Sequence, residues 1–208
     1  MLITFEGLDF SGKSTQIQLL VDRLKRERDD VLLVREPGGT SIGERIRSLL
    51  LDRNVAGMST VGELFLFSAS RVQLVEEVIK PALKKGTIVI CDRFYDSTTA
   101  YQGWGRGIPL EAVRAINETA AGGLVPDVTV FLDMPPAQIE ERISKRKLKD
   151  RMESNDRAFY ERVRNGYLAL AKEEKRFFVV DGTQSVEQLH EQIWARIAAL
   201  TKQSFHKE

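Results

Sequence analysis

The residues with the clearest capacity for chemistry form a glycine-rich segment close to the start of the chain. The segment from Gly7 to Ser14 reads GLDFSGKS and fits the pattern G-x-x-x-x-G-K-[ST]. Glycines at these places let backbone N–H groups converge on phosphate oxygens, and a helix that starts here adds the positive end of its dipole. Lys13 is expected to reach the β- and γ-phosphates, and Ser14 to offer its hydroxyl to Mg²⁺. The segment therefore predicts a site for a nucleoside triphosphate with Mg²⁺.

A site of this kind also needs a carboxylate near the metal, and two buried-looking runs end on one. Asp92 and Asp133 each follow a run of apolar residues. We predict that Asp92 is the carboxylate near the metal, because Arg93 beside it can bind an acceptor phosphate while Asp92 orders the waters around the ion. For Asp133 we expect a structural role ahead of a helix that begins near Pro136.

These residues need a framework that brings strand ends and helix starts together. Short β-branched or aromatic runs predict five buried strands, at Leu2–Phe5, Val31–Val34, Thr87–Cys91, Val128–Leu132 and Phe177–Val180. Segments with helical period lie between them, so parallel strands joined by right-handed crossovers are expected. We predict an α/β chain with the three-layer P-loop NTPase fold: a five-stranded parallel sheet, helices on both faces, a short lid, and ligands at the carboxyl ends of the strands.

Length and composition narrow the classes of protein to consider. With 208 residues and no internal repeat or low-complexity linker, the chain is predicted to form one domain over residues 1–208. Its 31 Lys and Arg nearly balance 30 Asp and Glu, and the net charge of +1 favours neither nucleic acid nor membrane as a partner. No stretch reaches the ~20 apolar residues of a membrane span. The single cysteine, Cys91, is expected to be buried in a reducing compartment. We therefore predict a cytoplasmic protein.

Among P-loop proteins, the sequence argues against regulatory GTPases and large ATPases. Guanine recognition needs the motif N-K-x-D, and no Asn in the chain is followed by Lys. Motor and transporter ATPases add a signature segment and a second domain, for which the chain has no room. A small metabolite kinase remains.

Six further segments, taken in order, resemble the thymidylate kinases, a family of P-loop nucleoside monophosphate kinase-like enzymes, as far as Gln184. They are Phe5-Glu6-Gly7, Arg35 to Thr40 (REPGGT), Leu66 to Arg71 (LFSASR), Asp92-Arg93-Phe94, Ala100 to Gly103 (AYQG) and Asp150 to Glu153 (DRME). The resemblance implies that ATP with Mg²⁺ phosphorylates dTMP to dTDP, in dTTP biosynthesis. It also implies a homodimer joined through helices on one side of the sheet.

The resemblance assigns the ATP and metal sites residue by residue. The residues at the metal are Ser14 and Asp92. The ATP-binding residues are the loop, the first residues of its helix and one arginine further along: Gly7, Leu8, Asp9, Phe10, Ser11, Gly12, Lys13, Ser14, Thr15 and Arg142.

For the monophosphate, the resemblance implies that thymine stacks on Phe67 and that Arg71 binds its carbonyl. The spacing agrees, because positions i and i+4 share a helix face, where a ring and a guanidinium can meet two edges of one base. Taken alone, Phe67 would be read as a core residue and Arg71 as a solvated charge.

The remaining substrate contacts are implied in the same way. Arg93 and Arg47 hold the phosphate of dTMP, and Asp9 accepts a hydrogen bond from its 3′-hydroxyl. Tyr101 leaves no room for a 2′-hydroxyl and so favours deoxyribose. Glu36 and Pro37 line the sugar and phosphate side. Thr98 and Gln102 line the edge of the base.

Phe10 is a departure, since eukaryotic-type members of the family carry an arginine at this place in the P-loop. Six of the ten residues from Arg142 to Arg151 are Lys or Arg, and four of them share one helical face: Arg142, Lys145, Arg146 and Lys149. A charge run is usually a solvated surface. The bacterial-type pattern, a basic lid over about 142–153 that ends in Asp-Arg-x-Glu, instead implies a phosphate-binding lid. The predicted catalytic residues are Lys13, Asp92, Arg93, Arg146 and Arg151.

Two alternatives stay open on the sequence. One is another nucleoside or nucleotide kinase, which would differ in its preferred acceptor. The other is a nucleic-acid-binding regulator that uses the basic residues 142–151, and its binding to DNA or RNA would depend on salt but not on dTMP. Outside the lid, the glycine-rich residues 103–107 are expected to form a mobile loop, and the polar tail over 201–208 is expected to fray.

Overall fold

The structure is a computed structural model that describes residues 1–28, 30–144, 151–152 and 155–204. Within these residues, five strands form one parallel sheet in the order β2-β3-β1-β4-β5. The strands are β1 (Leu2–Glu6), β2 (Val31–Arg35), β3 (Ile88–Asp92), β4 (Val128–Asp133) and β5 (Phe177–Asp181). The predicted α/β class with five parallel strands is confirmed.

Each strand runs one residue beyond its predicted end, and that residue is charged. The five terminal residues are Glu6, Arg35, Asp92, Asp133 and Asp181. An apolar pattern alone misses them, because a charged side chain at the end of a strand can leave the core while its backbone still pairs. All five charges therefore lie along the carboxyl edge of the sheet, where folds of this kind bind ligands.

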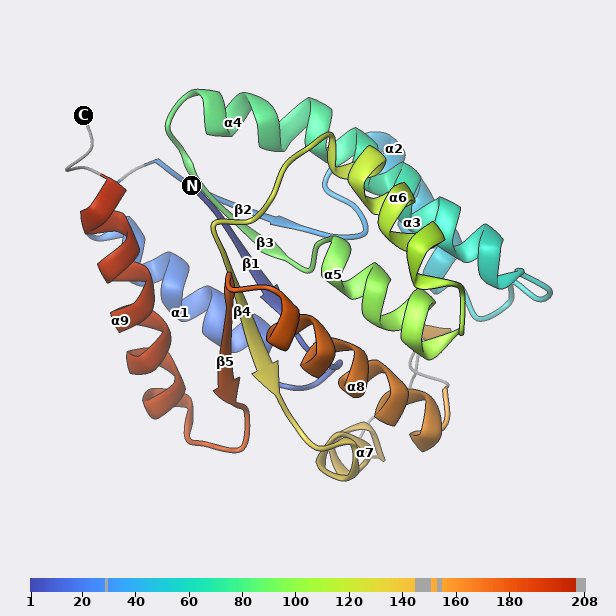
Figure 1. The fold of residues 1–208 in the computed structure, drawn as a ribbon. Helices are drawn as coiled ribbons and strands as arrows, with labels where there is room; N and C mark the ends of the chain where they lie inside the picture. Colours follow the sequence, from blue (N-terminus) through green and yellow to red (C-terminus); the bar gives the residue numbers. More distant parts are fainter. Residues whose placement is uncertain (29, 145–150, 153–154, 205–208) are drawn as a thin grey trace.

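Two helices cover one face of the sheet, α1 (Lys13–Lys25) and α9 (Val186–Ser204) (Figure 1). The apolar positions of α1 that have helical spacing are all buried against the sheet: Ile17, Leu20, Val21 and Leu24. From α9, the buried residues Leu189, Ile193 and Ile197 join the same core. Because α1 starts directly after the glycine-rich loop, this packing fixes the loop against the end of β1.

The opposite face carries the other main helices, which confirms the three layers. Those that contribute to its two apolar cores include α3 (Thr60–Leu74), η1 (Val75–Ile79), α4 (Lys80–Lys84), α5 (Tyr95–Thr98), η2 (Thr99–Gly105) and α8 (Arg157–Glu173). The helices α2 (Ser41–Leu51) and α6 (Leu110–Ala121) pack on α3 and reach the same cores with Leu51 and Ala121. A last helix, α7 (Pro136–Ser144), follows β4 and begins at the predicted proline.

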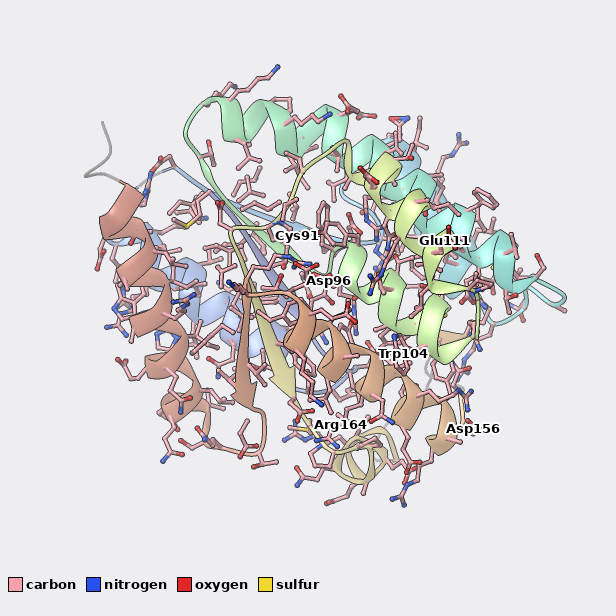
Figure 2. All side chains as sticks on the ribbon, viewed as in Figure 1. Cys91, Asp96, Trp104, Glu111, Asp156 and Arg164 are labelled. Carbon is pink, nitrogen blue, oxygen red and sulfur yellow. The ribbon has the colours of Figure 1, made fainter. Side chains whose placement is uncertain are left out.

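The expected mobile loop at residues 103–107 is wrong over its first part, because the chain stays helical through Gly105 in wide π-type turns. The glycines here serve close packing. A Cβ on Gly103 would lie 2.7 Å from Leu110 Cδ2, and one on Gly105 would lie 2.6 Å from Phe159 Cε2 on α8. Trp104 lies against α8 (Figure 2), where Gly166 makes room for its ring.

The predicted tail and lid fall partly outside the described part of the chain. Residues 201–204 belong to α9, so the prediction of a frayed tail is wrong for them, and residues 205–208 lie outside the described part. Of the predicted lid, residues 145–150 and 153 also lie outside it, and Arg146 is among them. Asp133 pairs with Arg164 of α8 at 2.6 and 2.8 Å, in keeping with the predicted structural role. Among the described residues, no helix is long and apolar enough to cross a membrane.

Candidate nucleotide site

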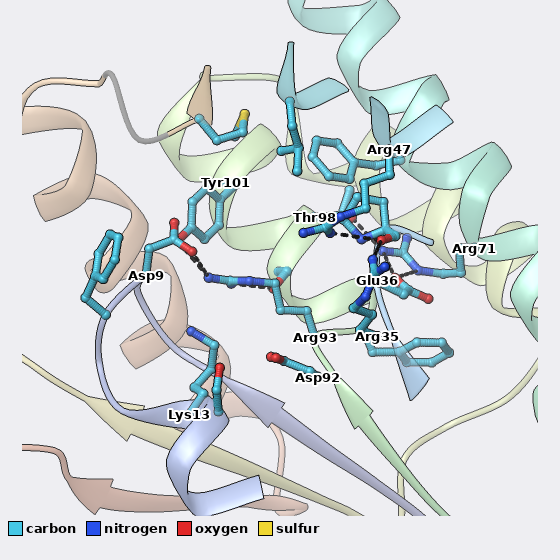
Figure 3. Close-up of a pocket in the computed structure, with 18 of the residues that line it drawn as sticks. Asp9, Lys13, Arg35, Glu36, Arg47, Arg71, Asp92, Arg93, Thr98 and Tyr101 are labelled. Atoms are coloured by element: carbon cyan, nitrogen blue, oxygen red, sulfur yellow. Dashed lines mark hydrogen bonds and ion pairs between the residues drawn. The ribbon is translucent and has the colours of Figure 1, made fainter. Parts of the chain in front are cut away.

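A cavity of about 590 Å³ lies at the carboxyl edge of the sheet (Figure 3). The predicted site residues that line it are Asp9, Phe10, Gly12, Lys13, Ser14, Thr15, Glu36, Pro37, Arg47, Phe67, Arg71, Asp92, Arg93, Thr98, Tyr101, Gln102 and Arg142. The cavity thus brings together predicted residues from eight separate parts of the chain. Gly7, Leu8 and Ser11 belong to the glycine-rich loop but do not line the cavity.

The glycine-rich loop has backbone conformations that its sequence pattern requires. Gly7 has φ 139°, and a Cβ here would lie 2.6 Å from the carbonyl oxygen of Leu132 on the neighbouring strand. Gly12, with φ 100°, is the residue that precedes α1. Phe10 also has a positive φ, 64°, without being glycine. The loop therefore turns the start of α1 towards the cavity, which places the positive end of the helix dipole there.

Lys13 ends this loop and lines the cavity, and its ammonium group binds back to the backbone of the loop. Its side chain is largely buried, and Nζ donates to the carbonyl oxygens of Gly7 (3.1 Å) and Leu8 (2.8 Å). Burial and the charge of Arg93 lower the pKa of Lys13 to about 8. An anion in the cavity would favour the charged lysine, so the loop is electrostatically prepared for phosphate.

Arg93 stands opposite Lys13, at the turn after β3 (Figure 3). Its φ is 70°, and its NH2 group donates to Asp9 Oδ1 (2.7 Å) and to Tyr101 Oη (3.3 Å). Tyr101 in turn donates to Asp9 Oδ2 (3.1 Å). Burial acts to raise the pKa of Asp9, but the charges of Arg93 and Lys13 outweigh it and lower the pKa. Asp9 is therefore ionised at neutral pH and can accept a hydrogen bond from a ligand hydroxyl.

Arg71 lies at the other end of the cavity and is 1% exposed. Its Nε donates to Glu36 Oε2 (2.8 Å), NH1 to Asn117 Oδ1 (3.1 Å) and NH2 to Thr98 Oγ1 (2.8 Å). NH2 also lies 2.7 Å from Glu36 Oε2. A guanidinium has five N–H groups, so one N–H on NH1 has no partner among the described residues and can bind a ligand carbonyl.

Thr98 and Gln102, predicted at the base edge, line the cavity but also hold other side chains. Thr98 accepts from Arg71, while Gln102 donates from Nε2 to Glu63 Oε1 (2.9 Å). The ring of Phe67 lines the same end of the cavity, one helical turn from Arg71. This end therefore offers an aromatic ring, one arginine N–H and the carbonyl of Gln102.

Two arginines between the ends converge on one backbone carbonyl. Arg47 and Arg35 donate to the carbonyl oxygen of Pro37 at 3.0 and 3.1 Å, and both line the cavity. Arg47 was predicted, but Arg35 was not. Its position at a strand end, inside the segment REPGGT, was the available signal.

Ser14 and Asp92 both contribute oxygen atoms to the lining of the cavity, and Asp92 lies near Lys13 (Figure 3). Mg²⁺ takes oxygen ligands and usually keeps several waters, with one or two protein oxygens and the substrate phosphates completing its shell. A hydroxyl and a carboxylate that both line the cavity fit this requirement.

The described arginines of the predicted lid differ in their placement. Arg142 lines the cavity, and its NH1 donates to the carbonyl oxygen of Phe10 (2.6 Å). Arg151 does not line it: NH1 pairs with the buried Glu63 (2.6 Å), and Nε donates to Leu50 O (2.7 Å). The geometry therefore gives no support to a catalytic role for Arg151, because its N–H groups are held by other elements.

Several residues in and around the cavity were missed by sequence reasoning. Lining residues that were not predicted are Arg35, Leu51, Phe94, Ser97 and Met152. Leu51 and Met152 are ordinary apolar residues with no signal of a site. Ser97 could not have been found from helical spacing, because Arg93 lies in the turn before α5 and has a positive φ.

Comparisons with known proteins agree on one family. The profile of the family described as "Thymidylate kinase" matches residues 5–193. A thymidylate kinase of Caldanaerobacter subterraneus subsp. tengcongensis is 49% identical over 194 residues, which cover 92% of this chain and 91% of that protein. One of Chlorobium chlorochromatii is 49% identical over 97% of this chain and 96% of its own length. The crystal structure of thymidylate kinase from Ehrlichia chaffeensis aligns with a TM-score of 0.78 and 36% identity, over 95% of this chain and 98% of that one.

Proposed function

The chain belongs to the thymidylate kinase family, and from that premise we propose how its residues act in the reaction. The enzyme transfers the γ-phosphoryl group of ATP to dTMP and yields ADP and dTDP, a precursor of dTTP. One observation carries the assignment of roles: a single cavity has the glycine-rich loop and Arg93 at one end and Phe67 with Arg71 at the other. A nucleoside monophosphate would lie between the two ends, with its phosphate towards the loop.

At the base end, thymine stacks on Phe67 and the free N–H of Arg71 binds its carbonyl. Thr98 and Gln102 line the base edge, while Glu36 and Pro37 line the sugar and phosphate side. Asp9 accepts a hydrogen bond from the 3′-hydroxyl, since its carboxylate is ionised beside Arg93. The ring of Tyr101, held by Asp9 and Arg93, excludes a 2′-hydroxyl.

At the phosphate end, Arg93 and Arg47 hold the phosphate of dTMP while Lys13 and the loop hold ATP. The ATP-binding residues are Gly7, Leu8, Asp9, Phe10, Ser11, Gly12, Lys13, Ser14, Thr15 and Arg142. A phosphate monoester is already a nucleophile near neutral pH, so the site needs little acid–base chemistry. Catalysis consists mainly of positioning and of neutralising charge, which explains why arginine, lysine and backbone N–H groups dominate.

Mg²⁺ is the proposed cofactor, which Ser14 would hold directly and Asp92 through waters. When bound, it would neutralise charge on the phosphates of ATP. The positions of the two residues support this role, because Ser14 follows Lys13 in the first turn of α1 and Asp92 ends the strand that precedes Arg93.

Positive charge near the transferring group has a second proposed source in the lid. Phe10 stands where other members of the family have an arginine, so Arg142 and Arg146 take over that task. Arg142 already lines the cavity beside Phe10. Arg146 lies outside the described residues, and its role follows from the family resemblance alone. We assign Arg151 to support of the site, through Glu63.

We further propose a homodimer whose interface includes the exposed face of α2 and α3. Exposed apolar residues lie on the two neighbouring helices: Ile42, Leu49, Val61, Phe65 and Val72. Phe65 is 56% exposed and stands between Val61 and Val72 on the same helical face. An exposed apolar stripe of this kind indicates a protein partner, and a second copy is the partner that the resemblance implies. Phe65→Asp should then lower the mass measured by light scattering to that of one chain.

The proposed location is the cytoplasm, without nucleic acid or membrane as a partner. The support is a nearly balanced net charge and a free, buried Cys91. Salt-dependent binding to DNA that dTMP does not affect would contradict this proposal.

The direct test is to compare acceptors in a coupled assay that measures ADP. With ATP and Mg²⁺ constant, dTMP should give the highest kcat/KM among dTMP, dUMP, the ribonucleotide of thymine, AMP and deoxythymidine. Preference for deoxythymidine would assign the enzyme to the nucleoside kinases. Preference for AMP would contradict the proposed base site.

A further inference from the structure

The position of Arg93 depends on contacts at both its backbone and its guanidinium. Its φ of 70° lies in the left-handed region, which non-glycine residues occupy only where surrounding contacts determine the conformation. On the side away from Asp9, NH1 donates to Ser97 Oγ (2.9 Å) and to Tyr167 Oη (3.3 Å). These two hydroxyls are therefore part of what holds the charge in place.

Glu6, the last residue of β1, lies behind these groups and is 0% exposed. Its Oε1 accepts from the backbone N–H of Phe94 (2.8 Å). Its Oε2 accepts from Ser97 Oγ (2.6 Å) and from Tyr167 Oη (2.9 Å). Because Phe94 follows Arg93 in the chain, one oxygen holds the backbone turn at Arg93 and the other holds both hydroxyls that face its guanidinium.

The count of hydrogens explains why a carboxylate is needed here. Each hydroxyl has one hydrogen, and when Glu6 accepts it, the lone pairs of the hydroxyl are free to accept from Arg93. An amide at position 6 would set its NH₂ group against at least one donor in either orientation. Its NH₂ group would face the N–H of Phe94, or it would face Ser97 and Tyr167 and turn their hydrogens towards Arg93.

We propose that Glu6 is a positioning residue for phosphoryl transfer, which fixes Arg93 through Ser97, Tyr167 and the turn at Phe94 without touching either nucleotide. This inference rests on the proposed function, in which Arg93 holds the phosphate of dTMP. Burial and the charge of Asp96 raise the pKa of Glu6 to about 7, against the lowering effect of Arg93. Burial and a neighbouring negative charge make a carboxylate costly at this position, which indicates that its acceptor oxygens have a function there.

The first experiment is Glu6→Gln, which keeps the size of the side chain and removes the second acceptor. It should lower kcat/KM for dTMP by about 10- to 100-fold, because a displacement of ~1 Å in a positioned group can cost about 10²-fold in rate. The KM for ATP should change little. Thr4→Val is the matched control: Thr4 is buried on the same strand, its hydroxyl bonds to Thr129 Oγ1 (2.9 Å), and it forms no hydrogen bond with Arg93 in the described part of the chain. The kcat/KM of Thr4→Val for dTMP should stay close to that of the wild type.

The deciding experiment repeats Glu6→Gln in an Arg93→Ala background, with dTMP affinity measured by calorimetry beside kcat/KM. If Glu6 acts through Arg93, the second change adds no further loss. An equal loss in both backgrounds would overturn the proposal, since Glu6 would then support the fold in general. Full activity of Arg93→Ala alone would instead contradict the proposed role of Arg93.

If Glu6→Gln does not fold, two milder variants can still test whether Glu6 acts through Arg93. Ser97→Ala and Tyr167→Phe each remove one hydroxyl between Glu6 and Arg93. Each should lower kcat/KM in the wild-type background and have no effect in Arg93→Ala. Losses of the same size in both backgrounds would overturn the proposal here too.

Discussion

The two ends of the cavity each hold an arginine, buried at the base end and partly buried at the phosphate end, and the two are held by opposite means. At the base end, Arg71 comes from a regular helix and uses its N–H groups on Glu36, Asn117 and Thr98. At the phosphate end, Arg93 comes from a turn with positive φ and is held by Asp9 and by hydroxyl groups.

The difference separates recognition from charge stabilisation. Arg71 is almost fully satisfied by the protein, so it presents one fixed N–H and can read a ligand without rearrangement. At the phosphate end, burial and the charge of Arg93 lower the pKa of Lys13, so the charged lysine is disfavoured until anions enter. Variants at the base end should therefore change ground-state binding, and variants at the phosphate end should change the chemical step.

The largest expected effect is that of Lys13→Ala at the phosphate end. It should lower kcat by about 10³-fold or more, because a preorganised cation at the transferring phosphoryl group is removed. The coupled ADP assay measures the loss. Thermal unfolding should show no loss of stability, since the buried ammonium with its pKa near 8 is disfavoured in the free protein. Normal turnover in a folded variant would exclude the P-loop assignment.

Substitution of the two arginines tests the comparison directly. Arg93→Ala should lower kcat and kcat/KM together, by about 10²-fold, because its charge acts most strongly in the transition state. Arg71→Lys should mainly raise KM for dTMP, because lysine keeps the charge but not the planar set of donors that bind Asn117 and Thr98. Steady-state kinetics with both substrates varied would give both patterns. The same pattern in both variants would refute the division of roles.

The next prediction tests the base end by a change in the substrate and not in the protein. Without the methyl group, dUMP should be a poorer substrate than dTMP by about 10- to 200-fold at most, because one apolar group contributes only ~1–3 kcal/mol. Competition between the two substrates measures the ratio. Complete rejection of dUMP would show that polar contacts, and not the apolar pocket, select the base.

A pH effect is expected from Glu6 at the phosphate end. Its pKa is raised from 4.5 to about 7 in the folded protein, so the folded state holds the proton more tightly than the unfolded state. The free energy of unfolding of the wild type should therefore fall, relative to Glu6→Gln, as pH rises from about 4.5 to 7, by about 1–3 kcal/mol. Urea unfolding at several pH values measures this difference. A constant difference across that range would contradict the raised pKa.

The smallest expected effect is that of Tyr101→Ala on the choice of sugar. Removal of the ring should lower the preference for dTMP over its ribonucleotide by about 10-fold, because exclusion by bulk involves no buried polar group. Tyr101→Phe is the control, since it keeps the ring and loses only the hydroxyl bonded to Asp9. An unchanged ratio of kcat/KM in Tyr101→Ala would place sugar discrimination at another residue.

The sequence by itself determined the fold class, the phosphate-binding loop and most of the residues that line the cavity. The fold class and the loop depend on local patterns: alternation of strands and helices, glycines at positions of positive φ, and short motifs at fixed spacing. Most of the substrate residues, including Phe67 and Arg71, were implied by the family resemblance, and for these two the spacing agrees because i and i+4 share a helix face. Strand ends were missed by one residue, since the apolar pattern stops before the backbone pairing does.

Only the tertiary structure decided which groups support those residues. Asn117 lies 46 positions from Arg71, and Tyr167 lies 161 positions from Glu6, so no local spacing relates them. In the same way, the pairing of Arg151 with Glu63 could not be read from the sequence, and Gly103 and Gly105 looked like a loop until their packing was seen. Local patterns specify the conformation of the chain, whereas the partner of a buried charge is set by which distant elements pack against it.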